Sequence, residues 1–373
     1  MVQRLGARLL VLGCFAVGSS AGLSAQVERP PELTGRQLYV AACQSCHGTD
    51  GRGASIDHVG FSDPLPDFTD CSYASREAGQ DWETVVRHGG PVRRFSRRMP
   101  SFGVALSGDE IARVVHYVRS LCTDQTWPRG ELNLPRAMET EKAFPEDETV
   151  LTGSYVRHAG TRQLTSTIVY ERRIGARNQW EVAIPVALQQ GSDKRWSGLH
   201  VADVELAVKR ALVHDADRGH IFSAGLELIL PTGDRQLGVG DGTLVYGGYL
   251  LAAQAFPANF FLQMQAGAEF PVNPQRREKE GYARAAFGTT TFALGGRSIS
   301  PMAEVVTSRP MGVSGAATTA DWIPQIQFAL TRRQHVLGNI GLRLPITDRS
   351  TRPRELVAYV LWDWFDGGFF TGW

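Results

Sequence analysis

The sequence predicts a multidomain protein in which a small all-α domain is followed by an antiparallel β-barrel of about 12 strands. Apolar residues recur at helical spacing near both ends of residues 32–123, whereas in residues 148–373 they alternate with polar or small residues. A charged segment interrupted by prolines separates the two regions and is expected to be a linker, residues 124–147. A length of 373 residues agrees with two domains.

Residues 1–25 have the pattern of a secretory signal peptide. Arg4 and Arg8 precede a short apolar run at residues 9–17, and small residues follow it. The run is too short for a membrane-spanning helix, which needs about 20 residues. We therefore expect export from the cytoplasm and removal of this segment.

The first expected helix of the all-α domain leads into Cys43-Gln44-Ser45-Cys46-His47. Leu38, Tyr39 and Ala42 stand at helical spacing before the first cysteine, and Thr34 is a suitable N-cap. This arrangement predicts a short helix that ends at the cysteine-containing motif.

The spacing Cys-x-x-Cys-His is that of a covalent attachment site for a c-type haem. Cys43 and Cys46 can each form a thioether to a haem vinyl group, and the imidazole of His47 is then held beside the iron as an axial ligand. The alternative, half of a structural zinc site, needs a second Cys/His pair at similar spacing, which the sequence lacks. The motif predicts one covalently bound haem c.

The residues around this motif resemble the class I cytochrome c family. The resemblance runs from Gly35-Arg36-Gln37-Leu38-Tyr39 through Cys43 and His47-Gly48 to Gly51-Arg52-Gly53, and it covers residues 32–123. In that family a helix delivers the haem motif, a loop brings a methionine to the other face of the iron, and a last helix crosses the first. The resemblance implies an electron-transfer domain.

Residues Arg98-Met99-Pro100-Ser101-Phe102 resemble the methionine loop of that family, which implies Met99 as the sixth iron ligand. A His/Met pair raises the reduction potential relative to bis-His ligation and suits an electron carrier. The alternatives are a methionine that only fills the core and the rival ligands His58, His88 and His116.

The closing helix of this domain is expected after residue 107. Ser107 and Glu110 form a capping-box pattern before an apolar stripe of 3.6-residue period that includes Ile111 and Val114. Tyr117 on the same helix is placed to pack against the first helix.

Cysteine usage indicates an oxidising compartment. Cys43 and Cys46 belong to the haem motif, and Cys14 lies in the N-terminal apolar stretch. Cys71 and Cys122 remain, and in an exported domain we expect them to form a disulfide. The alternative is two unpaired buried thiols.

A basic stretch lies beside the methionine loop. Residues 84–108 contain no acidic residue and five arginines, Arg87, Arg93, Arg94, Arg97 and Arg98. Such a cluster neutralises haem propionates or attracts an acidic partner, unless it is an ordinary solvated face. The net charge of +1 and the short basic stretch argue against a nucleic-acid partner.

The second half of the chain alternates consistently enough to assign faces. Leu206 and Val208 point to one side of their segment, and Glu205 and Lys209 to the other. About 12 such segments agree with the ~9–11 residues and even number of membrane-spanning strands, apolar outward and polar inward. A soluble β-sandwich is the alternative explanation of the same alternation.

Aromatic residues near the ends of these segments are candidates for the two interfacial girdles of a membrane barrel. They are Trp180, Trp196, Tyr246, Tyr249, Phe256, Phe260, Trp322, Trp362 and Trp364. The terminal Trp373, preceded by Phe369 and Phe370, is similar to the C-terminal signal of outer-membrane barrels.

Residues 198–209 and the turn Leu230-Pro231-Thr232-Gly233 are similar to small outer-membrane barrels and porin-like transport proteins of Gram-negative bacteria. The order of the two domains resembles the fused cytochrome-porins of iron-oxidising bacteria, which take electrons from extracellular iron. This resemblance implies an outer-membrane location. An even number of strands places both ends of the barrel, and with them the haem domain, in the periplasm.

These observations predict a mono-haem electron-transfer protein tethered to the outer membrane, and not an enzyme. Its partners are expected to be redox proteins, either periplasmic cytochromes or a membrane redox complex. No carboxylate pair or Ser/His/Asp arrangement indicates a hydrolase, and no Gly-Lys-Ser/Thr follows the glycines of residues 238–242. The alternatives are a haem enzyme or gas sensor, a cytochrome-porin that conducts electrons from extracellular donors such as iron, and a pore gated by the haem domain.

Overall fold

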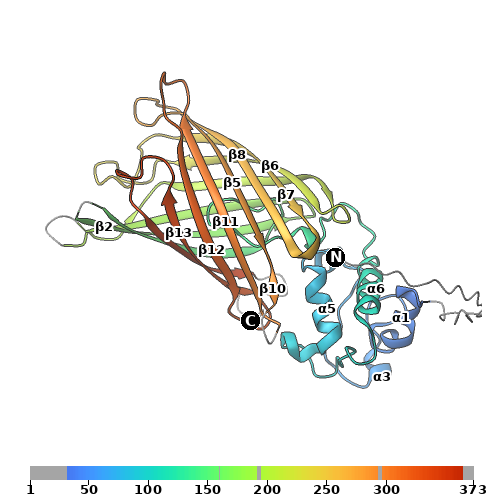
Figure 1. Cartoon of the computed structure of the whole chain (residues 1–373). Coiled ribbons are helices and arrows are strands. Elements are labelled where there is room, and N and C mark those ends of the chain that lie inside the picture. The colour runs from blue at the N-terminus through green and yellow to red at the C-terminus, as the bar shows by residue number, and fades with distance from the viewer. Residues whose placement is uncertain (1–31, 159, 191–194, 293–295, 364–373) are drawn as a thin grey trace, which may run out of the picture. The chain divides into compact units, whose positions relative to one another are not determined.

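The computed structural model describes residues 32–158, 160–190, 195–292 and 296–363 as a helical region followed by a β-barrel (Figure 1). The expected signal peptide, residues 1–25, lies outside these ranges, as do Cys14, Trp364 and the C-terminal residues up to Trp373. None of the helices in the described ranges has the length and apolar character needed to cross a membrane.

The helical elements lie in residues 35–132, except for one short turn between barrel strands. They are α1 Gly35–Ala42, α2 Gln44–His47, α3 Ile56–Val59, α4 Cys71–Ala74, α5 Gly79–His88, η1 Gly90–Arg93, α6 Gly108–Arg119, η2 Gly130–Leu132 and η3 Pro257–Asn259. The predicted N-cap Thr34 and the predicted capping box at Ser107 are both confirmed: Thr34 accepts from the Gln37 amide, and Ser107 accepts from the Glu110 amide, both at 3.3 Å.

Helices α1 and α6 cross at close range. A β-carbon on Gly35 would lie 2.2 Å from the carbonyl oxygen of Arg113, so this crossing requires glycine. The rings of Tyr39 and Tyr117 pack with centroids 5.3 Å apart, which confirms the predicted contact between the two helices. The surrounding core contains Leu38, Phe68, Val114 and Val118.

The strands form one antiparallel sheet. They are β1 Glu148–His158, β2 Thr161–Ile174, β3 Asn178–Gln190, β4 His200–Val201, β5 Val204–Asp215, β6 His220–Leu230, β7 Val245–Ala255, β8 Phe260–Pro271, β9 Glu280–Thr289, β10 Thr291–Phe292, β11 Ser298–Pro310, β12 Thr319–Ala329, β13 Val336–Pro345 and β14 Glu355–Asp363. Apart from the two-residue strands β4 and β10, each strand pairs with its neighbours in chain order.

The sheet closes on itself. Strand β14 pairs with β1, with Glu148 opposite Asp363, and β9 pairs with β11, so the twelve long strands form a complete ring. The prediction of about 12 strands is confirmed. The alternative of a soluble β-sandwich is wrong, because a sandwich has two sheets with free edges and this sheet has no free edge among its long strands.

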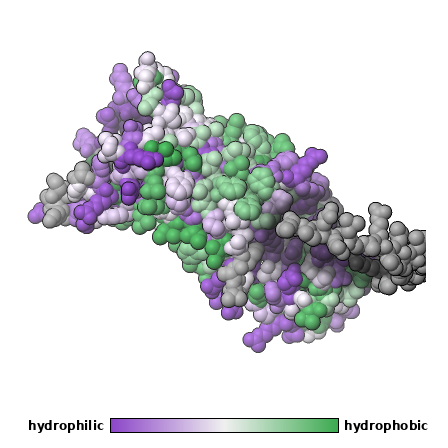
Figure 2. Space-filling model, in the orientation of Figure 1, coloured by the Kyte–Doolittle hydropathy of each residue, from purple (hydrophilic) through white to green (hydrophobic). Residues whose placement is uncertain are grey.

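Apolar side chains cover the outside of the barrel and polar side chains point into it, as the alternation predicted. Leu226 is 65 % exposed on the outside, whereas Lys209 is 5 % exposed and points inward. Met264 is exposed outward and lies between the inward-facing Gln263 and Gln265. Figure 2 shows the apolar residues gathered over the middle of the barrel and hydrophilic residues toward its ends.

One of the expected girdle residues is placed differently. Tyr249 is 3 % exposed and belongs to the core inside the barrel, so its assignment to an interfacial girdle is wrong. Tyr246 and Trp322 are exposed on the outside, as that prediction requires. Tyr249 lies on the opposite face of its strand from Tyr246, and inside the barrel it packs against apolar side chains of residues 132–144, which come from the segment predicted as a linker.

Candidate functional site

The haem-attachment motif sits at the junction of α1 and α2. Cys43 ends α1 and begins α2, and its amide donates to the Tyr39 carbonyl at 2.8 Å. Cys46 and His47 form the last turn of α2. Of the described cysteines, Cys43 and Cys46 are free and half-buried. The structure therefore brings two thiols and one imidazole together on a single short turn.

Tyr39 holds the end of this turn in place. Its hydroxyl donates to the Gly48 carbonyl at 2.6 Å and lies 3.2 Å from the His47 carbonyl. Burial, followed by the nearby Cys43 thiol, raises the pKa of Tyr39 to about 12, so the phenol keeps the proton that it donates.

The loop after the motif folds back onto it. The Gly53 amide donates to the His47 carbonyl at 2.9 Å, and the Ala54 amide donates to the Cys46 carbonyl at 2.8 Å. These bonds satisfy the carbonyl groups at the end of α2, which its short length leaves without helical partners. They fix the orientation of the motif relative to the rest of the domain.

The environment of His47 is apolar. The Phe68 ring lies 4.9 Å from the imidazole, between centroids. Burial lowers the pKa of His47, so the ring is neutral at pH 7, the form in which an imidazole binds iron. Its Nδ1 is buried and has no hydrogen-bond partner within the described residues.

The Cys43 thiol is also held in its neutral form. Burial, and then the neighbouring Cys46, raise the pKa of the Cys43 thiol to about 11. Free thiols beside a neutral, half-buried imidazole fit a covalently attached haem, because the thiols would form thioethers with it and the imidazole would bind its iron.

Met99 comes from a separate loop between η1 and α6. Its carbonyl accepts from the Gly90 amide at 3.0 Å. Gly89 has φ +80°, and a β-carbon there would lie 2.9 Å from the Met99 carbonyl oxygen. The end of α5 thus fixes the backbone of Met99 through two glycines. The rival ligands are placed on other elements, His58 on α3, His88 at the end of α5 and His116 on α6.

The arginines near the methionine loop do not form one basic surface. Arg93 is 3 % exposed, and its Nη2 lies 2.6 Å from Oδ1 of Asp81. Arg98 lies 3.3 Å from the Asp63 carboxylate. Arg94 and Arg97 are exposed. Two of the five arginines therefore have structural ion pairs, a distinction that the sequence pattern does not contain.

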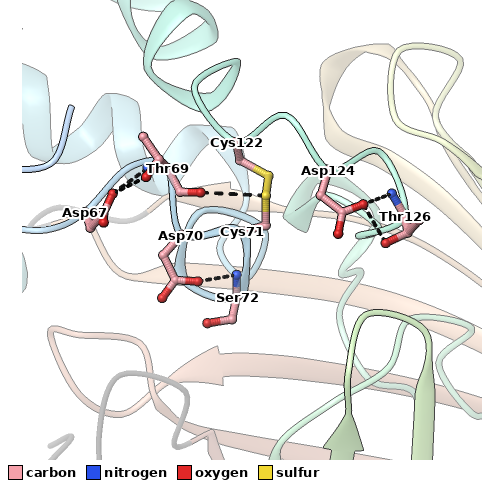
Figure 3. The surroundings of a disulfide bond; sticks show 8 residues. All are labelled: Asp67, Thr69, Asp70, Cys71, Ser72, Cys122, Asp124 and Thr126. Atoms are coloured by element: carbon pink, nitrogen blue, oxygen red, sulfur yellow. Dashed lines mark hydrogen bonds between the residues drawn. A yellow bond between two sulfur atoms is a disulfide. The ribbon is translucent and has the colours of Figure 1, made fainter. Parts of the chain in front are cut away.

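The expected disulfide is present. Cys71, the first residue of α4, is bonded to Cys122 with the Cα atoms 5.0 Å apart (Figure 3). The carboxylates of Asp67, Asp70 and Asp124 accept hydrogen bonds from the amides of Thr69, Ser72 and Thr126 respectively, which orders the chain on both sides of the bond. The bond joins the loop after the haem motif to the segment that follows α6.

Sequence reasoning missed the aromatic residues around the motif. Phe68 packs on Trp82 at 5.7 Å between centroids, and Trp82 packs on Tyr73 at the same distance. These rings extend the apolar surroundings of His47. Their positions follow from the loop between α2 and α5, whose path no periodic pattern predicts.

Comparison with known families agrees with this geometry. Residues 30–118 match the family model described as cytochrome c oxidase, cbb3-type, subunit III. These residues form a cytochrome c domain. A cytochrome c domain carries covalently bound haem c, and here it is followed by the closed twelve-stranded barrel. A search of curated proteins found no match to the chain.

Solved structures similar to this protein include three barrels. The KdgM porin has a TM-score of 0.39 and 9 % identity, and the match covers 58 % of this chain and 99 % of the porin. An outer membrane channel from Pseudomonas putida F1 has a TM-score of 0.43 and 12 % identity, over 61 % and 99 % of the two chains. The translocator domain of the autotransporter NalP from Neisseria meningitidis has a TM-score of 0.31 and 13 % identity. The match covers 57 % of this chain and 85 % of that domain.

Proposed function

We propose that this protein is a mono-haem c-type electron-transfer protein tethered to the outer membrane by its barrel. Cys43 and Cys46 would attach the haem, and His47 and Met99 would ligate its iron. A haem held by these residues would supply a one-electron Fe(II)/Fe(III) couple between a donor and an acceptor. The observation that carries this proposal is the pair of free thiols beside a half-buried, neutral imidazole in a cytochrome c domain.

The surface of the barrel supports its role as the membrane anchor. The long strands have between 9 and 14 residues, enough for the ~9–11 residues that a spanning strand needs. Large apolar side chains are exposed around the ring, on strands as far apart as β2, β6 and β13, among them Ile168, Leu226 and Ile340. A soluble protein rarely exposes such a continuous apolar surface, whereas a lipid bilayer covers it.

The strand connections support a periplasmic haem domain. Glu148, the first residue of β1, lies opposite Asp363, the last residue of β14, so the chain enters and leaves the ring at one end. The connections at that end include the short turns at residues 175–177 and 216–219, whereas the other end has residues 231–244 and 346–354. Outer-membrane barrels have their short turns in the periplasm. The haem domain precedes Glu148 and belongs on that side.

The partners in this proposal are proteins that exchange single electrons, either periplasmic cytochromes or a membrane redox complex. The protein is a carrier and not an enzyme. A haem held by both His47 and Met99 would have no open position on its iron for a substrate.

Membrane fractionation combined with reduced-minus-oxidised spectroscopy tests the proposal. The full-length protein, produced with functional haem-attachment machinery, should be found in outer membranes and show the spectrum of a six-coordinate c-type haem. The double variant Cys43→Ala/Cys46→Ala should lose covalent haem, and the matched variant Cys71→Ala/Cys122→Ala should retain it. A colourless wild-type protein that has reached the outer membrane would overturn the assignment.

A further inference from the structure

The barrel interior is occupied by the chain's own residues 130–147. Leu132, Leu134 and Phe144 pack against apolar side chains of the wall, and Phe144 is 0 % exposed. The wall side chains in this cluster are Ala211, Ile221, Tyr249, Leu251, Ala253, Phe261, Tyr282, Ala286 and Met302. Because these come from strands β5 to β9 and β11, the segment has apolar contacts around half of the ring.

Wall side chains also satisfy the backbone of this segment. The carbonyl oxygens of Pro135, Arg136, Glu139, Lys142 and Ala143 accept hydrogen bonds of 2.6–2.7 Å from Gln263, Tyr359, Arg284, Lys209 and Ser223 respectively. The Glu146 amide donates to Gln179 at 2.7 Å. An irregular segment surrounded in this way has its polar groups paired without forming a strand of its own.

Buried ion pairs hold the segment in register. Nη1 of Arg136 lies 2.6 Å from carboxylate oxygens of both Glu148 on β1 and Glu171 on β2. Nζ of Lys142 pairs with Glu146 and lies 3.6 Å from Glu148. Both glutamates on the wall are almost fully buried, so withdrawal of Arg136 would leave them uncompensated.

A second anchor lies across the ring. Oε1 of Glu304, on β11, accepts from the amide and the hydroxyl of Thr140, both at 2.5 Å. The other carboxylate oxygen accepts from Gln325 at 2.9 Å. Arg136 and Thr140 thus tie the segment to the seam at β1 and β2 and to β11, which lies beyond β12 to β14 along the ring.

The segment starts directly from the cytochrome c domain. Nη2 of Arg119, at the end of α6, lies 2.9 Å from the carboxylate of Glu131 on η2. The Arg119 side chain is only 3 % exposed. A β-carbon on Gly130 would lie 2.0 Å from the Glu77 carbonyl oxygen, so the chain at the start of the segment is packed closely against the helical domain. The start of the segment is therefore held by direct contacts with the helical domain.

We propose that residues 130–147 are a resident plug that closes the barrel to ions and small solutes. The barrel anchors the haem domain and does not conduct while the plug is seated. A cavity of about 90 Å³ lies beside Glu139 and Arg284. This proposal does not depend on the haem, because all of the contacts that seat the plug come from side chains and backbone of the chain itself.

Conductance of the full-length protein in planar lipid bilayers tests the plug. Wild-type protein should give no steady conductance. A variant in which residues 134–145 are replaced by a Gly/Ser sequence of equal length should conduct steadily, with at least a ten-fold larger current. Heat-modifiable migration of both proteins checks that the barrel has folded. Equal currents in the two proteins, or a folded variant that stays closed, would overturn the proposal.

Thiol labelling gives a test that leaves the segment in place. Ala143→Cys introduces a thiol at a position that is 2 % exposed inside the barrel, and Ser314→Cys introduces one in an exposed loop. A membrane-impermeant maleimide should label Ser314→Cys rapidly and Ala143→Cys at least ten-fold more slowly. Adding Arg136→Ala and Glu304→Ala should speed labelling of Ala143→Cys. Equal labelling rates at the two positions in otherwise native protein would contradict a seated plug.

The two proposals fail separately. A protein without haem that still stays closed in bilayers would reject the electron-transfer function and leave the plug standing. A wild-type protein that contains haem and conducts steadily would reject only the plug. The reduction potential of the Gly/Ser variant should equal that of the wild type, because the replaced residues lie outside the haem motif and the methionine loop.

Discussion

Tyr39 and Gly48 are joined by a hydrogen bond of 2.6 Å that links the first helix to the residue directly after the haem motif. The same hydroxyl lies 3.2 Å from the His47 carbonyl. Tyr39 is fully buried and also packs on Tyr117 of α6. One side chain therefore connects the two crossing helices with the end of the attachment motif.

Removing this hydroxyl should weaken the domain without removing the haem. We expect Tyr39→Phe to lower the free energy of unfolding by about 1 kcal/mol, because two carbonyl groups lose a buried donor while the ring packing is kept. Urea titration of the detergent-solubilised protein, followed by haem absorbance, measures the change. Tyr155→Phe, on the exposed face of β1, is the matched control and should leave the transition unchanged. A Tyr39→Phe midpoint equal to that of the wild type would contradict the expected role.

Replacing Met99 should change the electronic properties of the haem. We expect Met99→His to lower the reduction potential on the order of 0.1 V, because bis-His ligation favours Fe(III) more than His/Met ligation does. Redox titration of the purified protein measures this shift. Met311→Leu, a conservative change in a barrel loop, is the control. If Met99→His leaves the reduction potential unchanged and His116→Ala shifts it, the iron ligand is His116 and not Met99.

The position of Met99 should depend on Gly89. An alanine in the left-handed helical region costs about 1–2 kcal/mol, and Gly60, with φ 72° and ψ 18° and no atom within 4 Å, would carry only this cost. Gly89 has φ 80° and ψ 167°, a conformation that essentially only glycine adopts, so an alanine there is strained further. At Gly89 the new methyl group would also collide with the Met99 carbonyl. We expect Gly89→Ala to create a population with lowered potential and Gly60→Ala to keep the wild-type potential. The two variants behaving alike in redox titration would show that the loop is not held from this side.

The disulfide should contribute to stability and not to haem attachment. It closes a loop of 51 residues, and loss of such a bond costs roughly 2–4 kcal/mol, mainly through the entropy of the unfolded chain. We expect Cys71→Ala/Cys122→Ala to lower the unfolding free energy of the cytochrome c domain by this amount. Wild-type protein treated with a reductant should unfold in urea at the same midpoint as this double variant. A double variant as stable as the oxidised wild type would contradict this expectation.

Much of the fold can be predicted because its signals are local or periodic. The capping boxes at Thr34 and Ser107 mark helix starts with hydrogen bonds that span only three residues. The alternation of Val208 with Lys209 predicts the two faces of a strand, since one face meets lipid and the other a polar interior. The thiols and the imidazole of the haem motif lie together because they are neighbours in the chain.

The plug could not be predicted for a physical reason. Prolines and charges in residues 130–147 are typical of a solvated linker, and the same residues suit the interior of a barrel, whose wall is itself polar. Arg136 is buried against wall carboxylates. Its neighbours in the sequence are the same as those expected around a solvent-exposed arginine. The inward position of Tyr249, by contrast, follows from the alternation along its strand, which places Tyr249 on the opposite face from the exposed Tyr246 and Leu250.

The pairing of β14 with β1 also joins the plug to the wall that surrounds it. The ring closes where Asp363 lies opposite Glu148, and residues 130–147 lead directly into that seam along the chain. The wall and its contents are therefore one continuous chain. Emptying the finished ring means pulling an uncleaved stretch of chain out through one mouth while the folded helices beside that mouth are still attached to it.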